Sequence, residues 1–282
     1  MKNIIAFILC LSFLTACDSE DLGTSNITIP EFDYDALSET DKYIYDEYTV
    51  PFNVEVIYRW NQGDASQGDM IKNLVPPKES QVVPFLSMIK KVWIDTYTAE
   101  VGAKTLRSYI PKQILLVGSP SYNDDGSTTE GTAEGGRQIV LYSINEFNFQ
   151  KAQIQSYAHV MHHEFAHILH QNIEFDPEFK KITPDYTSSW GNMNDEMARN
   201  KGFITAYASS KAEEDFVEMV SIMLTNTPED WNAMIENVDN TEAKEALRKK
   251  ESIVKSYMKT NWGIDMVKFQ KSVVAAIDAA AQ

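Results

Sequence analysis

The residues best suited to chemistry are five histidines, all of which lie between positions 159 and 170. Three of them occur in the run HEFAHILH at positions 163–170. This run contains the pattern HExxH, in which two imidazoles one helical turn apart hold Zn²⁺ and the intervening glutamate acts on a water molecule. On a helix, residues i and i+4 lie on one face about 6 Å apart along the axis, so both rings can reach one ion. We therefore predict that His163 and His167 bind Zn²⁺ and that Glu164 is a general base.

A helix over about residues 150–172 would position these side chains. At about 100° per residue, the histidines that fall within about 40° of His163 are His159, His167 and His170. The opposite side carries the apolar residues Ile154, Tyr157, Met161, Phe165 and Ile168. His162 points sideways and is expected to be structural or to face solvent. One helix would therefore bury one face and present histidines on the other.

Two imidazoles do not complete a catalytic zinc site, which normally has three protein ligands and a water. His170 is one candidate for the third ligand, but it lies about 4.5 Å beyond His167 along the helix axis. A straight helix does not easily bring three such rings onto one ion, so His170 is also a candidate for a residue behind the ligands or along the cleft. The other candidate is Glu214, which lies one turn before Glu218 on a predicted second helix.

That second helix begins near position 210, where Ser210 and Glu213 have the spacing of a capping box. Glu213 and Asp215 are expected to be ordinary solvent-facing acids. A gluzincin site takes its third ligand from a glutamate on such a helix, and the next carboxylate can orient a metal-bound imidazole through its other nitrogen.

The pattern Tyr-x6-Glu-x3-Glu downstream of HExxH resembles the catalytic domain of the anthrax lethal factor protease. The resemblance implies that Glu214 is the third zinc ligand and that Tyr207 stabilises the transition state. It also implies that Glu218 supports the zinc ligands without binding the metal itself. The pattern HExxHxxH, together with Gly202-Phe203 and the run EDFVE, also resembles zinc-binding metallopeptidase lipoproteins of Bacteroidota. These motifs cover about residues 155–225. Genes of that family often lie beside outer-membrane nutrient-uptake systems, which implies a neighbouring uptake complex as a partner.

The N-terminus has the features of a lipoprotein signal peptide over residues 1–16. Lys2 is followed by an apolar run too short to span a bilayer stably, and the run ends in Leu-Thr-Ala-Cys. These four residues resemble a bacterial lipobox, which implies acylation of Cys17. An acidic tether would follow over residues 17–40, and its first residues resemble the export tag of surface-displayed lipoproteins in Bacteroidota. We expect an exported lipoprotein, in the outer membrane and exposed at the surface; an ordinary cleaved signal peptide is the alternative.

The net charge of −16 excludes the classes of protein that need a basic face. Nucleic-acid binding is not expected, because phosphate neutralisation requires clustered Lys and Arg. Binding to anionic lipid through a basic patch is excluded on the same ground, so the lipid anchor would hold the chain at the membrane.

The remaining pattern predicts one zincin-like metallopeptidase domain over residues 41–282. Strands are predicted at 53–60, 113–118 and 137–143, a helix at 84–100 and a loop at 120–136. The chain is irregular over 173–209 and helical afterwards, with helix boundaries at Thr227-Pro228 and Gly263. The fold class is therefore α+β: a small mixed sheet and the active-site helix in a sheet-bearing half (about 41–172), followed by a mostly helical half (about 173–282). By analogy with zincins, the strand at 137–143 would be the edge strand to which a peptide adds.

Two functions fit these features. The first is a zinc-dependent endopeptidase of the gluzincin type that acts on a peptide or protein substrate, with Trp190 as a candidate cleft wall. The alternative is a catalytically silent protein with the same fold that binds peptide or glycan for an outer-membrane uptake system. A general base at Glu164 favours the first function, because a binding protein needs none.

Overall fold

The computed structural model describes residues 32–61, 73–123, 128–134 and 137–281. Leu37–Gln282 form one compact unit. The predicted signal peptide, Cys17 and most of the acidic tether lie outside the described residues. Among the described residues, no helix has both the length and the apolar run needed to cross a bilayer.

A four-stranded mixed sheet forms the first half of the domain, in the order β1-β2-β6-β5. Its strands are β1 (Glu55–Ile57), β2 (Gln113–Leu116), β6 (Gln138–Leu141) and β5 (Gly131–Glu134). β1, β2 and β6 run parallel, and β5 is antiparallel to β6. The apolar runs of β2 and β6 are buried along most of their length, as expected for central parallel strands. The three strands predicted from the sequence are confirmed, each shorter than its predicted range.

The predictions for the edge of this sheet were wrong in two respects. β6 is not the edge strand, because β5 pairs with it from the outer side. The segment 120–136 is not only a loop: it also contains β5 and the short pair β3 (Ser121–Tyr122) and β4 (Thr128–Thr129). The sequence Gly-Thr-Ala-Glu of β5 lacks apolar alternation, and its strand conformation comes from pairing with the apolar β6.

Helices from the N-terminal part of the chain cover the sheet-bearing half. The longest is continuous through α4 (Glu79–Ile89), the π-helical turn η4 (Lys90–Ile94) and α5 (Asp95–Val101). It confirms the helix predicted at 84–100 but begins five residues earlier, with Pro84 inside its second turn. The shorter elements are α2 (Glu39–Ile44), η1 (Tyr45–Thr49), α3 (Val50–Phe52), α6 (Ala103–Tyr109) and η5 (Ile144–Glu146).

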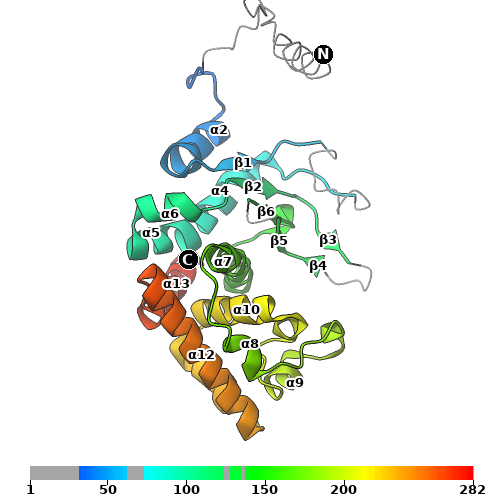
Figure 1. Cartoon of the computed structure of the whole chain (residues 1–282). Coiled ribbons are helices and arrows are strands. Elements are labelled where there is room, and N and C mark those ends of the chain that lie inside the picture. The colour runs from blue at the N-terminus through cyan, green and yellow to red at the C-terminus, as the bar shows by residue number, and fades with distance from the viewer. Residues whose placement is uncertain (1–31, 62–72, 124–127, 135–136, 282) are drawn as a thin grey trace, which may run out of the picture. The chain divides into compact units, whose positions relative to one another are not determined.

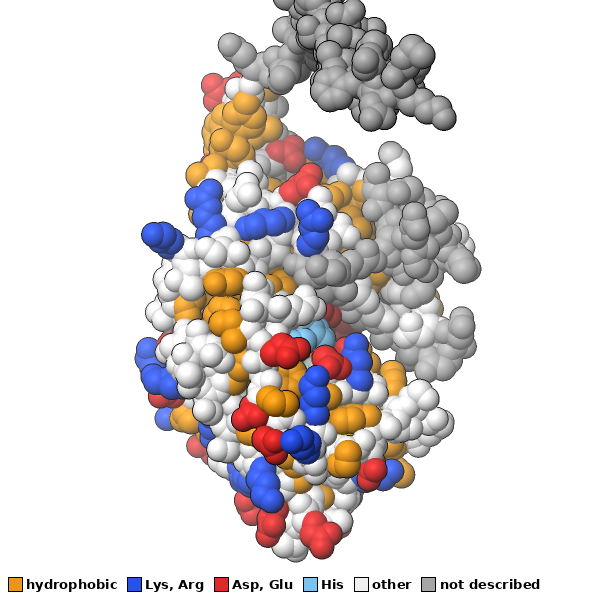
Figure 2. Space-filling view, viewed as in Figure 1, with side chains coloured by type: hydrophobic (Ala, Val, Ile, Leu, Met, Phe, Trp, Pro, Cys, Tyr) orange, Lys and Arg blue, Asp and Glu red, His pale blue; other side chains and the backbone are white. Residues whose placement is uncertain are grey.

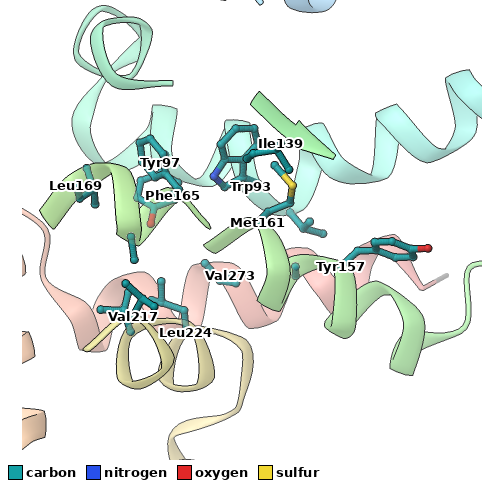
Figure 3. Close-up of a cluster of buried hydrophobic side chains, with 14 of the residues drawn as sticks. Trp93, Tyr97, Ile139, Tyr157, Met161, Phe165, Leu169, Val217, Leu224 and Val273 are labelled. Carbon is teal, nitrogen blue, oxygen red and sulfur yellow. The ribbon is translucent and has the colours of Figure 1, made fainter. Parts of the chain in front are cut away.

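Helix α7 (Lys151–Asn172) lies between the sheet and the C-terminal helices and confirms the helix predicted at 150–172 (Figure 1). Its apolar side chains enter the main core, where Figure 3 shows them between α4–α5 on one side and α10 and α13 on the other. Phe165 packs edge-on against Trp93 and Tyr97, with ring centroids 5.8 and 4.7 Å away. Burial of each such aromatic side chain stabilises the fold by about 2–3 kcal/mol. The histidine-bearing side of the same helix is thereby held in a fixed direction.

The second half is helical, as predicted. Its elements are α8 (Phe179–Ile182), η6 (Trp190–Asn192), α9 (Asp195–Arg199), η7 (Tyr207–Ser210), α10 (Ala212–Thr225), α11 (Pro228–Glu236), α12 (Thr241–Trp262) and α13 (Met266–Ala280). Thr227 caps α11 by accepting from the Asp230 amide, and Gly263 ends α12 in the left-handed conformation, so both predicted boundaries are confirmed. The capping box at Ser210 is wrong, because Lys211 takes the N-cap position in an extended conformation. Ser210 belongs instead to the preceding turn η7.

Candidate active site

Three side chains from α7 and α10 converge on one point. The Nε2 atoms of His163 and His167 lie 3.0 and 3.2 Å from Oε2 of Glu214. One ligand atom of each residue lies within 4.8 Å of the other two. A tetrahedral Zn²⁺ with bonds of about 2.0–2.1 Å separates neighbouring ligand atoms by roughly 3.4 Å. Two imidazole nitrogens and a carboxylate oxygen at these separations fit a zinc ion without rearrangement of either helix.

The carboxylate of Glu218, one turn further along α10, lies behind His163. Its Oε1 accepts from Nδ1 of His163 at 2.7 Å and from Nε2 of His159 at 2.9 Å. Its Oε2 accepts from the hydroxyl of Thr205 at 2.7 Å. This contact orients the ring of His163 so that Nε2 faces Glu214.

His170 lies behind the second imidazole. Nε2 of His170 is 3.1 Å from Nδ1 of His167, whose Nε2 faces Glu214. Burial lowers the pKa of His170 to about 4, so His170 is neutral at pH 7 and accepts this hydrogen bond. Its ring packs edge-on against Phe175 and Phe216, which stack on each other. Among the described residues, His170 belongs to neither group whose donor atoms converge, so the geometry fits the position behind a ligand and not that of a ligand.

Glu164 and Tyr207 line the same cleft as the three converging groups. The cleft has a volume of about 920 Å³ and lies between β4–β5 and the segment that carries η6 and η7. Figure 2 shows histidine side chains on this face with acidic and basic side chains beside them. Tyr207 is 38 % exposed, and its ring centroid lies 6.0 Å from that of His163.

Burial and charge shape the protonation of these groups. Burial lowers the pKa of His163, but hydrogen bonds to Glu214 and Glu218 outweigh it and raise that pKa to about 10. Burial raises the pKa of Glu214, yet its contacts with the two histidines hold it well below its usual range. Burial also raises the pKa of Glu164 above its usual value, which makes this carboxylate a stronger base.

The hydroxyl of Tyr207 remains protonated over the physiological range. Burial and the nearby carboxylates of Glu214 and Glu164 raise the pKa of Tyr207 far above its ordinary value. A neutral phenol can donate a hydrogen bond into the cleft. Its ring is held by Trp190, which packs edge-on at a centroid distance of 5.0 Å. Trp190, predicted as a candidate cleft wall, lines the cleft.

The expectation that Asp215 faces solvent was wrong. Its side chain is fully buried on the far side of α10 and pairs with the equally buried Lys250 of α12 at 2.5 Å. Tyr186 donates to the same carboxylate oxygen at 3.1 Å, and Lys250 donates to the carbonyl of Gly202 at 2.7 Å. This ion pair joins α10 and α12 to the segment that leads to Tyr207. Glu213, by contrast, forms a surface pair with Lys180.

Sequence reasoning missed several residues around the site. His162 is not one of them: of the two expectations for it, structural or facing solvent, the first is confirmed, because it is fully buried beside Tyr97 and Phe269. Lys211 lies 3.3 Å from Oε1 of Glu214, and no motif marks it or Thr205. The edge strand β5 was also missed, although Gly131 gives a weak signal, since glycine within a strand often marks a close approach. A Cβ at Gly131 would lie 2.4 Å from Val160 of α7.

Comparison with known proteins identifies the family. Residues 34–267 match a family described as "Putative zinc-binding metallo-peptidase". The chain belongs to this family. A crystal structure of a protein with the same description from Bacteroides caccae ATCC 43185 is 32 % identical in sequence and superimposes with a TM-score of 0.74, covering 86 % of this chain and 95 % of that one. No match was found among curated proteins. Family and structure confirm the α+β metallopeptidase fold and Zn²⁺ as the metal of this family.

Proposed function

We propose that this chain is a zinc-dependent endopeptidase of the gluzincin type. The observation that carries the proposal is the convergence of His163, His167 and Glu214 on one point of an open cleft that Glu164 and Tyr207 also line. The family description supports peptidase chemistry in general terms. The three converging groups would hold the ion, with His163 oriented by Glu218 and His167 by His170.

Zinc bound there would polarise the scissile carbonyl and bring the pKa of a water molecule near neutrality. Glu164 would accept the proton of that water and later deliver it to the leaving amine. Its raised pKa suits the first step, because a carboxylate with a higher pKa is a stronger base toward the proton of the water. Glu164 lies between the two imidazole ligands in sequence, so α7 positions the base and the metal together.

Tyr207 would donate a hydrogen bond to the substrate carbonyl oxygen as it gains negative charge. Its position beside His163 and its raised pKa support this role. Such donors are typically worth a few kcal/mol at the transition state. The packing of Trp190 against the phenol ring favours one orientation of the donor before substrate binds.

Among the described residues, no strand pairs with the outer edge of β5, which supports binding of an extended chain there. The carbonyl of Glu130 accepts from the amide of Tyr142, so Glu130 and Thr132 direct their main-chain groups toward β6. By alternation, Gly131 and Ala133 direct theirs toward the open edge. A substrate strand could pair with these groups by main-chain hydrogen bonds, which suits cleavage within a polypeptide.

We further propose that the chain is an exported lipoprotein of the outer membrane, held through acylated Cys17 and exposed at the surface. The short apolar run that ends in Leu-Thr-Ala-Cys supports the anchor, and the acidic residues after Cys17 support display. Peptide or protein would be the substrate, and a neighbouring nutrient-uptake complex would be the partner.

The test compares wild type with Glu164→Gln and Glu213→Gln on an unbiased peptide library, with zinc content determined for all three proteins. Glu164→Gln should retain zinc and lose about 10²–10⁴-fold in cleavage rate, because it removes the general base. Glu213→Gln is the matched control, since Glu213 lies on the surface and pairs with Lys180. Full activity of Glu164→Gln would refute the mechanism. Zinc in every sample with cleavage in none would favour the alternative function of peptide or glycan capture.

A further inference from the structure

We propose that Thr205 is a positioning residue that ties the turn carrying Tyr207 to the metal-binding helices through Glu218. The inference rests on the proposed role of Tyr207 and adds a residue that neither the motif nor the family description marks. Thr205 is buried, and its hydroxyl donates one hydrogen bond and accepts another.

The first contact is with α10. The Thr205 hydroxyl has one proton, which it donates to Oε2 of Glu218 at 2.7 Å. The other oxygen of that carboxylate accepts from His163 and His159. Because Glu218 is 2 % exposed and its burial must be offset by hydrogen bonds, each of its oxygens is held by a specific donor. Thr205 is thereby fixed relative to the metal ligand His163.

The second contact is with the turn η7. The same hydroxyl accepts from the backbone amide of Ala208 at 3.1 Å. Thr205 and Ala208 lie on either side of Tyr207 in sequence, so this hydrogen bond closes the chain around the residue that bears the phenol. Hydrogen bonds of this kind, between a local hydroxyl and the backbone, stabilise turns that lack the regular backbone hydrogen bonds of a helix or a sheet.

Together the two contacts form a link from His163 through Glu218 and Thr205 to the backbone at Tyr207. The link explains how a side chain on an irregular segment can keep a fixed distance to ligands on two long helices. A donor that drifts by about 1 Å can cost about 100-fold in rate, so the link has a direct effect on turnover.

The test uses Thr205→Val, which keeps the shape of the side chain and removes the hydroxyl, in the full chain loaded with zinc. We expect kcat to fall about 10–100-fold, as for other groups that orient active-site residues, with KM and zinc content little changed. Zinc should stay bound because Oε1 of Glu218 still holds His163. Thr205→Ser should recover most of the activity. Thr96→Val is the matched control, since within the described part of the chain the buried Thr96 hydroxyl contacts only carbonyls of its own helix.

Two further measurements separate a link to Tyr207 from a general structural effect. In a Tyr207→Phe background, Thr205→Val should cost little more, because the donor it positions is already absent. Hydrogen exchange of the Ala208 amide should accelerate about tenfold in Thr205→Val and return toward wild type in Thr205→Ser.

The inference would be overturned if Thr205→Val lowered kcat as much in the Tyr207→Phe background as in wild type. It would also be overturned if Thr205→Val left the hydrogen exchange of the Ala208 amide unchanged. If wild type cleaves no peptide, the proposed function fails, while the exchange of Ala208 still decides whether Thr205 holds the turn. If Tyr207→Phe alone leaves activity intact, the role of the tyrosine fails and the inference fails with it.

Discussion

Replacing Lys250 with methionine should destabilise the protein strongly, and more so at alkaline than at acidic pH. The side chains of Lys250 and Asp215 are both 0 % exposed and lie 2.5 Å apart. Removal of the ammonium leaves the carbonyl of Gly202 without this donor, which costs about 1–3 kcal/mol. It also leaves a buried carboxyl with no cation. Loss of one partner of a buried pair typically costs about 3–5 kcal/mol in total, or a fall of about 10 °C in Tm for a domain of this size.

The pH dependence follows from the carboxyl. Burial raises the pKa of Asp215 to about 6 even with Lys250 opposing it, against an ordinary value of 3.8. A carboxyl whose pKa is higher in the folded than in the unfolded state stabilises the fold at low pH, and this stability is lost as pH rises through the folded pKa. In wild type this stability is lost by slightly above pH 6. In Lys250→Met no cation opposes the effect of burial, so the pKa of Asp215 is higher and the stability continues to fall at higher pH. The difference between the two proteins should therefore grow from pH 6 to pH 8.

Urea unfolding followed by circular dichroism at pH 5, 6, 7 and 8, at one fixed free zinc concentration, measures these differences. The double variant Asp215→Asn with Lys250→Met should recover part of the loss and remove its pH dependence. Lys255→Met, on the same helix but partly exposed in its pair with Glu251, should cost under about 1 kcal/mol. A loss below about 1 kcal/mol for Lys250→Met at pH 8, or an equal loss at pH 5 and pH 8, would refute the reasoning.

Two other changes test the surroundings of the ligands. His170→Phe removes the acceptor behind His167 while keeping an aromatic ring against Phe175 and Phe216, and it should weaken zinc affinity about 10–100-fold in a competition titration with a chelator; unchanged affinity would show that His167 needs no such partner. Gly131→Ala places a Cβ 2.4 Å from Val160, so thermal unfolding should show a loss of about 1–3 kcal/mol that Val160→Ala relieves in the double variant. A stable Gly131→Ala single variant would mean that β5 can move away from α7.

The sequence predicted the parts of the site that depend on local geometry. His163, Glu164 and His167 share one helix, and their spacing alone places them on related faces of it. Glu214 and Glu218 are also one turn apart, but no local pattern says that α10 packs beside α7. Their assignment needed the resemblance to known proteases, and the convergence with Glu214 exists only in the folded chain.

The features that escaped prediction depend on partners far away in the sequence. Asp215 lies in an acidic run and resembles a surface residue, and its burial depends on hydrogen bonds from Tyr186 and from Lys250, 35 positions later (250 less 215). Thr205 has no motif, because its role comes from one hydrogen bond across to α10 and one within its own turn. β5 is a strand because β6 is beside it, a cause that its own residues do not encode.

The two helices that supply the converging groups are joined by a long stretch of chain. A bound metal would therefore affect the stability of the fold as well as the chemistry of the site. An ion held by His167 and Glu214 closes a loop of about 48 residues, which in a chain-entropy treatment of cross-links corresponds to about 4 kcal/mol. No cysteine occurs among the described residues, so no disulfide can constrain this part of the fold. A chain that crossed a membrane unfolded would acquire this cross-link only on the far side. Its resistance to unfolding and to proteolysis would then depend on the zinc available on that side of the membrane.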